Sequence, residues 1–220
     1  TKRVEAEQNL KESEKRFKIL FNNSTSGIAY HKIVYDSDGN PINYIITDVN
    51  PQFDKILPYK RGDVINVKAT KAYKVEQAPY LDIYSEVTKI QKSTSFETYF
   101  PPIDKHFKIS VISPEKGKFI TVFDDISERK KAEQKLEESE EKFRTISEES
   151  LSGISIVQDD VFKYINQPFL DYTGYTREEI ENWKPGDLYE ILVHPEQREE
   201  VKEISRNNQS GESKLIKLTR

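Results

Sequence analysis

The side chains that could carry out chemistry are few and far apart in this chain of 220 residues. Its three histidines are His31, His106 and His194, and no two of them have the spacing of a pair of metal ligands. The chain contains no cysteine, which excludes disulfides, thiolate metal sites and thiol nucleophiles. The sequence also lacks a glycine-rich phosphate loop, a Ser/His/Asp arrangement and the nucleotide-binding signature of kinases. We therefore expect neither a metal site nor an enzyme activity in this segment.

Composition separates the chain from several classes of protein. Charged residues make up 33% of it and hydrophobic residues 35%, and the net charge is −4. So many charges need solvated faces, which long exposed helices supply. The basic residues form no stripe that would bind nucleic acid, and no apolar run approaches the roughly 18 residues that span a bilayer. We expect a cytoplasmic protein with no nucleic-acid or membrane contact here, and the absence of methionine indicates an excerpt of a longer chain.

A repeat organises the elements that must position these side chains. Residues 3–28 are identical to residues 129–154 at half of their positions, and a second block pairs residues 49–61 with residues 165–177. The first copy has extra residues between the two blocks, around Asp36–Pro41, where a turn between two strands is expected. Since hairpin tips tolerate insertions, the sequence indicates two tandem domains of one family.

Each copy combines strands and helices in the same order. In the first copy we expect strands at 27–35, 42–49, 95–100, 106–112 and 118–123, with short helices before a longer one at 79–91. In the second copy the matching segments are strands at 153–157 and 161–165, a helix at 195–207 and a third strand at 214–220, after which the last two strands are missing. Segregated strands and helices indicate an α+β fold, with an antiparallel sheet and helices on one face.

Polar residues mark the expected starts of helices. Asn50 is a favourable N-cap for a helix that starts there, with Pro51 at its first position, and Asn166 repeats the device. Asp125 can cap the exit helix of the first copy, with Glu128 closing a capping box.

A charged helix precedes each copy, at 1–21 and at 126–147. Apolar residues recur along both helices in steps of four and three, which forms an a/d seam. Its members are Ala6, Leu10, Ser13, Phe17 and Leu20 in the first helix and Ala132, Leu136, Ser139, Phe143 and Ile146 in the second. The seam is short and contains serine, so we expect it to pair two copies of the chain only with help from the domains.

Several motifs, in order along the chain, resemble those of PAS domains. Residues 123–130 (Phe-Asp-Asp-Ile-Ser-Glu-Arg-Lys) resemble the Asp-Ile-Thr-Glu-Arg motif that ends a PAS core and begins its exit helix, with Ser127 in place of threonine. Residues 172–180 and 194–196 resemble the mid-domain helix and the start of the long helix. His106-Phe107 and residues 113–117 resemble late strands of PAS modules in prokaryotic sensor kinases.

The resemblance covers nearly the whole chain, with domains at 22–125 and 148–220. It implies a five-stranded antiparallel sheet for each complete domain, with a cavity between the sheet and the helices. It also implies homodimers and an output domain elsewhere in the parent chain, usually the histidine kinase of a two-component system and sometimes a cyclase or a transcription factor. Thr1 aligns with Ser127, so a further PAS-like domain is expected upstream.

The family resemblance excludes some classes of cofactor but does not identify one. PAS haem sensors carry their iron ligand in the long helix, where this chain has no histidine, so we expect no haem. A cysteine-linked flavin is excluded because cysteine is absent. The identity of any ligand stays open.

Two sets of residues are the candidates for function. Strand alternation and the long helix place the candidate ligand pocket at Tyr84, Val87, Phe96, Thr98, Phe107, Ile109, Val111 and Thr121. The candidate signal relay at the start of the exit helix consists of Asp125, Ile126, Ser127 and Glu128. In one interpretation the first copy detects a small molecule or a change in its upstream neighbour and passes it through the helices of a dimer. In the other, both copies are dimerising spacers with filled cores.

Overall fold

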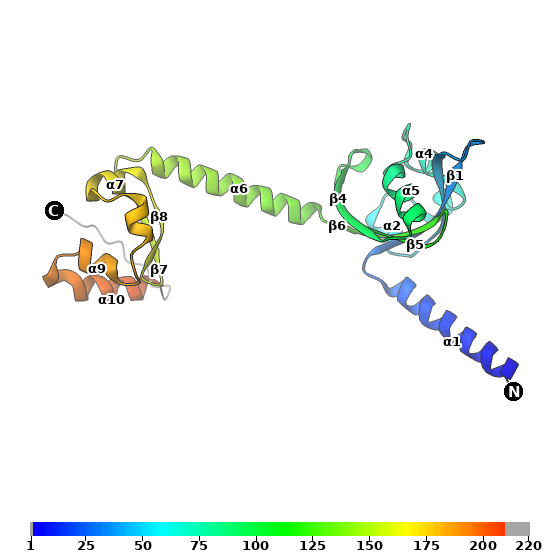
Figure 1. The fold of residues 1–220 in the computed structure, drawn as a ribbon, viewed down its shortest axis with the longest axis horizontal. Helices are drawn as coiled ribbons and strands as arrows, with labels where there is room; N and C mark the ends of the chain where they lie inside the picture. Colours follow the sequence, from blue (N-terminus) through cyan, green and yellow to red (C-terminus); the bar gives the residue numbers. More distant parts are fainter. Residues whose placement is uncertain (1, 210–220) are drawn as a thin grey trace. The chain divides into compact units, whose positions relative to one another are not determined.

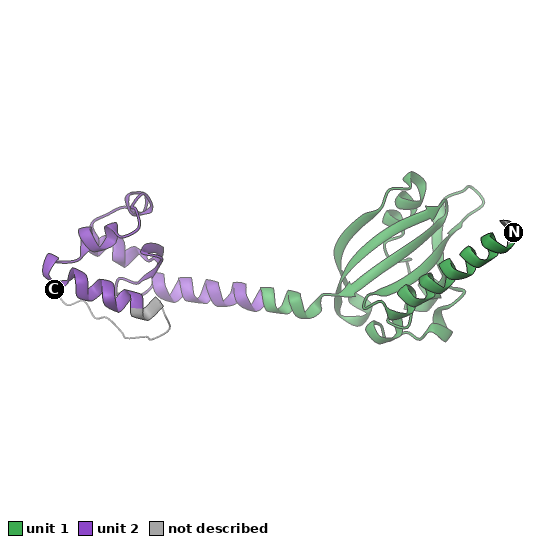
Figure 2. Ribbon diagram, turned by 90° about the horizontal axis from the view of Figure 1, so that it is seen from below, with its two compact units in different colours: residues 1–133 green, residues 134–220 purple. Residues whose placement is uncertain are grey.

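The computed structural model describes residues 2–209. The chain divides into two compact units, residues 1–133 and residues 134–220, which Figure 2 shows in different colours. In the part of the chain that is described, no helix is both long enough and apolar enough to cross a membrane.

Unit 1 is built on an antiparallel sheet of six strands. They are β1 (Gly27–Tyr35), β2 (Pro41–Val49), β3 (Val67–Lys68), β4 (Thr94–Phe100), β5 (Lys105–Glu115) and β6 (Lys118–Asp125). Their order across the sheet is β3-β2-β1-β6-β5-β4. The predicted α+β fold is confirmed, but the predicted count of five strands is wrong for this unit. The extra strand, β3, has only two residues and pairs Lys68 with Ile45, which is too short to show a period of two in the sequence.

The helices between β2 and β4 cover one face of this sheet (Figure 1). They are α2 (Phe53–Ile56), α3 (Arg61–Val64), α4 (Ala69–Tyr73) and α5 (Leu81–Ile90). Strand alternation turns Ala29, His31 and Ile33 of β1 inward, where all three are buried. The N-terminal helix α1 (Lys2–Asn23) leaves from the opposite face, and the ring of Phe21 packs 5.8 Å from that of Tyr30.

The turn between β1 and β2 carries the extra residues of the first copy. The Asp36 carboxylate accepts hydrogen bonds from the backbone N–H groups of Asp38 (2.9 Å) and Asn40 (2.7 Å). In the second copy the chain reverses through Asp159 and Asp160, both at positive φ, as a two-residue hairpin requires. The insertion therefore lies at a hairpin tip, as the repeat predicted.

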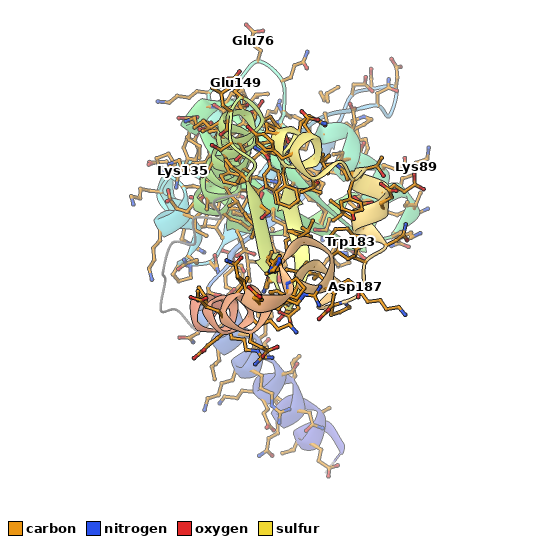
Figure 3. All side chains as sticks on the ribbon, turned by 90° about the vertical axis from the view of Figure 1, so that its left-hand side faces the viewer. Glu76, Lys89, Lys135, Glu149, Trp183 and Asp187 are labelled. Carbon is orange, nitrogen blue, oxygen red and sulfur yellow. The ribbon has the colours of Figure 1, made fainter. Side chains whose placement is uncertain are left out.

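Unit 2 is smaller in its described part. Its two-stranded sheet consists of β7 (Ser155–Gln158) and β8 (Val161–Ile165), followed by α7 (Gln167–Thr173), α8 (Arg177–Glu181), α9 (Asp187–Leu192) and α10 (Arg198–Gln209). The third strand predicted at 214–220 lies outside the described residues. Trp183, labelled in Figure 3, packs 5.1 Å from the ring of Tyr175 and 6.1 Å from that of Phe162.

One helix, α6 (Ser127–Glu148), follows β6 directly. Its first turns belong to unit 1 and its later turns to unit 2. In the sequence, α6 therefore precedes the second copy as α1 precedes the first.

Candidate functional site

A buried asparagine joins the end of α1 to the core of unit 1. Asn50 is 1% exposed, and its Oδ1 accepts hydrogen bonds from the backbone N–H groups of Ile28 (2.9 Å) and Phe53 (3.1 Å). Its Nδ2 donates to the carbonyl oxygens of Phe21 (3.1 Å) and Ser26 (2.9 Å). Because Phe21 lies in α1 and Ile28 in β1, one side chain holds the helix, the first strand and the start of α2 together.

Asn166 makes the same joint between α6 and unit 2. Its Oδ1 accepts from the backbone N–H groups of Ile154 (2.7 Å) and Phe169 (3.0 Å), and its Nδ2 donates to the carbonyl oxygens of Ser147 (2.6 Å) and Ser152 (3.0 Å). Each amide thus uses two acceptor and two donor sites, its full capacity. The sequence predicted both residues as N-caps, and the second is one. In unit 1 the helix begins at Phe53 rather than at Asn50, after a turn.

Other repeated residues support this joint. Ser24 Oγ accepts a hydrogen bond from Ser26 N (3.1 Å), and Ser150 Oγ accepts one from Ser152 N (3.0 Å). The guanidinium of Arg61 donates to the carbonyl oxygen of Val49 at the end of β2, and Arg177 donates to that of Ile165 at the end of β8. The repeat in the sequence is therefore largely a repeat of one hydrogen-bonded structure.

The repeated glycine of the joint makes room for a ring. A Cβ at Gly27 would lie 2.3 Å from Phe123 Cζ, so any side chain here would displace that ring. In unit 2 a Cβ at Gly153 would lie 3.0 Å from the Cα of Phe169. Close packing at the joint therefore explains why glycine stands at both positions.

The predicted relay residues lie where β6 becomes α6. Asp125 Oδ2 accepts from Lys105 Nζ (2.6 Å), and its Oδ1 accepts from Ser127 N (2.9 Å). Ser127 Oγ accepts from His106 N (3.0 Å), and Ile126 N donates to the His106 carbonyl oxygen (2.9 Å). Burial raises the pKa of Asp125, but hydrogen bonds from Lys105 and Ser127 outweigh it and hold this pKa below its usual value. The first turn of α6 is thus bonded to β5.

Ion pairs bind the same turn to β4. The Glu97 carboxylate lies 2.7 Å from Arg129 Nη2 and 3.0 Å from Lys130 Nζ. Hydrogen bonds from Lys130 and Arg129 lower the pKa of Glu97. Glu128 points elsewhere, because it pairs with Lys131 (3.2 Å) and is 92% exposed at its side chain. The capping box predicted between Asp125 and Glu128 is therefore not formed, since Glu128 pairs with Lys131 and Asp125 accepts from Ser127 N instead.

The predicted dimer helices expose their seam. Leu10 and Leu136 are each 61% exposed, and Phe17 and Phe143 remain 49% and 44% exposed although each contacts its own domain. Ser139 is also exposed. Apolar side chains at helical spacing in solvent are characteristic of a surface that pairs with another helix.

Unit 1 contains a cavity of about 60 Å³ between its sheet and its helices. It is lined by His31, Tyr44, Leu57, Tyr73, Pro79, Tyr80, Tyr84, Phe100, Phe107, Ile109, Thr121 and Phe123. This space exceeds the minimum of about 10–15 Å³ that one water molecule needs. It is therefore large enough for water or for a small ligand.

The structure brings half of the predicted pocket residues together. Tyr84, Phe107, Ile109 and Thr121 line the cavity. The other four do not: Val87 and Val111 are buried in the core, and Phe96 and Thr98 are half-buried. Thr98 reaches the pocket only indirectly, through a hydrogen bond to the Tyr80 hydroxyl (3.3 Å).

His31 is a cavity residue that the sequence interpretation missed. It is 4% exposed, its ring stacks 4.5 Å from Phe119, and its Nε2 lies 2.9 Å from Thr121 Oγ1. Among the described side chains, its Nδ1 is the buried polar atom without a hydrogen-bond partner. Burial lowers the pKa of His31 to about 3, so the imidazole is neutral. Its alternation with Ala29 and Ile33 was the signal that could have placed it inward.

Tyrosines supply most of the other polar atoms of the cavity. Tyr44 and Tyr84 are buried, with ring centroids 5.5 Å apart, and Tyr80 lies 6.1 Å from Tyr84. Burial, and then the neighbouring tyrosines, raise the pKa of Tyr44 and of Tyr84 well above the usual value. Tyr44 pairs with the inward-facing Ile33 and alternates with the buried Ile46, and this alternation was the signal that could have placed it inward.

The second copy does not repeat this chemistry. At the corresponding positions of the repeat, Val157 replaces His31, and an exposed Glu200 replaces Tyr84. Across residues 2–209, no cluster of three or more His, Cys, Asp or Glu side chains could hold a metal ion. The polar cavity is thus a feature of unit 1, whereas the asparagine joint is common to both units.

Comparison with known proteins gives a family and several similar structures. A family model described as PAS domain matches residues 26–128 and 151–220. A search of curated proteins found no match. The chain is similar to a domain of an HTR-like protein from Haloarcula marismortui ATCC 43049, with 21% identity over 47% of this chain and 99% of that chain and a TM-score of 0.36.

Two further structures are similar at lower identity. A domain of the sensory box sensor histidine kinase/response regulator from Geobacter sulfurreducens shares 15% identity over 53% of this chain and 96% of that chain, with a TM-score of 0.38. An RNA-binding light-oxygen-voltage receptor shares 14% identity over 58% of this chain, with a TM-score of 0.41. The chain covers 36% of that receptor's length.

Proposed function

Because the chain belongs to the PAS domain family, we propose that it is the sensory and signal-relay region of a larger cytoplasmic signal-transduction protein. Unit 1 is the sensor, α6 carries its state to unit 2, and the output domain, a histidine kinase, lies elsewhere in the same parent chain. The segment itself has no catalytic role. ATP hydrolysis by the purified chain above the level of a boiled sample would contradict that last statement.

The attachment of α6 is the observation that carries this proposal. At its first turn, Ser127 is bonded to β5 and Arg129 to Glu97 of β4. At its last turn, the carbonyl oxygen of Ser147 accepts a hydrogen bond from Asn166 in the core of unit 2. A helix bonded to a sheet at one end and to a buried amide at the other can transmit a displacement, which a flexible linker cannot.

The cavity of unit 1 lies on the strands that lead to both helices. His31 of β1 and Thr121 of β6 meet across the cavity wall (2.9 Å). The first residues of β1 belong to the Asn50 joint with α1, and β6 leads into α6. A change in the cavity would therefore act on the two strands that hold the signalling helices.

Removing the Glu97 carboxylate should alter unit 2 if α6 is a relay. In Glu97→Ala, Arg129 and Lys130 lose their partner on β4, and the first turn of α6 keeps only its bonds to β5. The single tryptophan of the chain, Trp183, lies in unit 2 and reports its state. We expect a shift in Trp183 emission and faster hydrogen exchange in the last turn of α6.

Glu115→Ala is the matched control for that experiment. It removes an exposed carboxylate that pairs with Lys118 at the β5–β6 turn, away from α6. A passive spacer predicts that neither substitution reaches Trp183. If Glu97→Ala and Glu115→Ala give the same Trp183 emission as the unmodified chain, the relay through α6 is refuted.

The seam residue Ser139 offers a test of helix pairing. In Ser139→Leu each protomer adds one leucine to the seam, and burying it in a dimer is worth about 1.5–3 kcal/mol. We expect the dimer dissociation constant, measured by sedimentation equilibrium, to fall at least tenfold, and the output of the intact parent protein to change. Glu141→Leu adds the same apolar surface off the seam. Equal tightening by both variants would exclude a dimer through this seam.

A further inference from the structure

The cavity of unit 1 has a uniform chemistry. Its lining is aromatic and aliphatic, with an imidazole and several hydroxyl groups as its polar atoms. Within residues 2–209, no Asp, Glu, Lys or Arg side chain lines it. A bound anion would find no positive partner there, and a bound cation no negative one. Burying either ion without a partner is strongly unfavourable.

The pKa shifts of the cavity residues show that the cavity disfavours charge of either sign. Burial lowers the pKa of His31 to about 3, so the surroundings strongly disfavour a positive charge. Burial also raises the pKa of Tyr44 and of Tyr84, so the same surroundings disfavour a negative charge. Both signs are opposed by the same low-dielectric environment.

The cavity also has unused hydrogen-bonding capacity. Among the described side chains, His31 Nδ1 is buried without a hydrogen-bond partner, so a polar group placed beside it could bond to it. Tyr44 and Tyr84 also line the cavity, and their hydroxyls make no hydrogen bond to the described residues. A small molecule with one polar group could bond to these atoms while its apolar part contacts Phe107 and Phe123.

We propose that unit 1 binds a small uncharged molecule with a hydrogen-bonding group that reaches His31 and the tyrosine hydroxyls. This inference rests on the proposed sensory function and names the class of its ligand. Carboxylates and ammonium compounds of the same size are rejected. Unit 2, with Val157 in place of His31, does not bind such molecules at the corresponding position.

Probes of matched size and different charge test this proposal. The full chain, labelled with 15N in its histidines, would be titrated to about 50 mM with propionamide, pyrazole, propionate or propylammonium. We expect propionamide or pyrazole to shift the His31 imidazole signals saturably, with propionate and propylammonium binding at least tenfold more weakly. The signals of His106 and His194 are internal references.

Two variants separate the cavity from the surface. His31→Phe fills the place of the imidazole with an apolar ring and should weaken propionamide or pyrazole binding at least tenfold, whereas His194→Gln, in unit 2, should leave it unchanged. The proposal fails if propionate or propylammonium binds as tightly as the neutral probes, or if neither neutral probe shifts His31. The relay would survive either result, because the Glu97→Ala measurement at Trp183 requires no ligand.

Discussion

Replacing Asn50 or Asn166 with alanine is expected to lower the free energy of unfolding of the affected unit by about 3–4 kcal/mol. Each amide satisfies two backbone N–H groups and two carbonyl oxygens in a site that is at most 1% exposed. Alanine removes all four of these bonds, although Phe53 N keeps its bond to the backbone oxygen of residue 50 and Ser147 O keeps the one from Ser150 N. Each buried group that is left without a partner costs about 1–3 kcal/mol before water enters the space.

The loss should be greatest at the attached helix. In Asn50→Ala we expect rapid hydrogen exchange at the amide of Ile28 and undocking of the last turn of α1. In Asn166→Ala the urea midpoint of unfolding, measured by Trp183 emission, should fall. When Glu97→Ala is added to Asn166→Ala, the Trp183 emission should no longer change. The joint thus carries both the stability of the unit and its coupling to the helix.

Asn43 provides the matched control. It is also a buried asparagine of unit 1, but its side chain makes hydrogen bonds only to Thr70 and to the adjacent Tyr44. Asn43→Ala should cost about 1 kcal/mol and leave α1 docked. Comparable costs for Asn43→Ala and Asn50→Ala, or an unchanged α1 in Asn50→Ala, would show that the joint does not hold the helix.

Acidification from pH 6.5 to pH 5 is expected to destabilise unit 1 by about 2 kcal/mol through His31 alone. The folded-state pKa of His31 is about 3, below the ordinary value of 6.5. Between these values the unfolded chain binds a proton that the folded unit does not, so stability rises with pH, by about 1.4 kcal/mol per unit. The full stability is present above pH 6.5 and declines as the pH falls toward 3.

The window between pH 5 and pH 6.5 isolates this residue. The groups that face it, Thr121, Tyr44 and Tyr84, do not titrate there. Asp125 and Glu97 have lowered pKa values, so their contributions are lost only at lower pH, below about 4. Urea unfolding, followed by aromatic NMR signals of unit 1, measures the slope.

Histidine variants decide whether the slope belongs to His31. His31→Phe should remove the dependence between pH 5 and pH 6.5, and His106→Gln should preserve it. A slope that persists in His31→Phe would mean that another group titrates on unfolding. A neutral ligand that binds His31 should raise stability at every pH in this window.

The sequence by itself determined the features that depend on local pattern. The repeat revealed two domains, strand alternation and segregated helices predicted the α+β fold, and the turn residues around Asp36 located the insertion. Asn166 was recognisable as a helix cap because a cap bonds to backbone three residues away, as Asn166 does to Phe169. The same prediction for Asn50 was wrong, because α2 begins only at Phe53. The apolar spacing along α1 and α6 was visible in the sequence alone, and the pairing that it predicts stays a prediction.

Only the tertiary structure decided what these residues contact at long range. The second half of each asparagine joint is a bond to a backbone carbonyl, at Phe21 or Ser147, and carbonyl groups leave no mark on the sequence. Tyr44 faces the cavity beside Tyr84 of a distant helix, and Glu97 meets Arg129 because the first turn of α6 reaches past β5 to β4. Local sequence specifies periodicity and helix caps. Contacts between residues distant in the chain depend instead on how the strands pair and how the helices pack on the sheet.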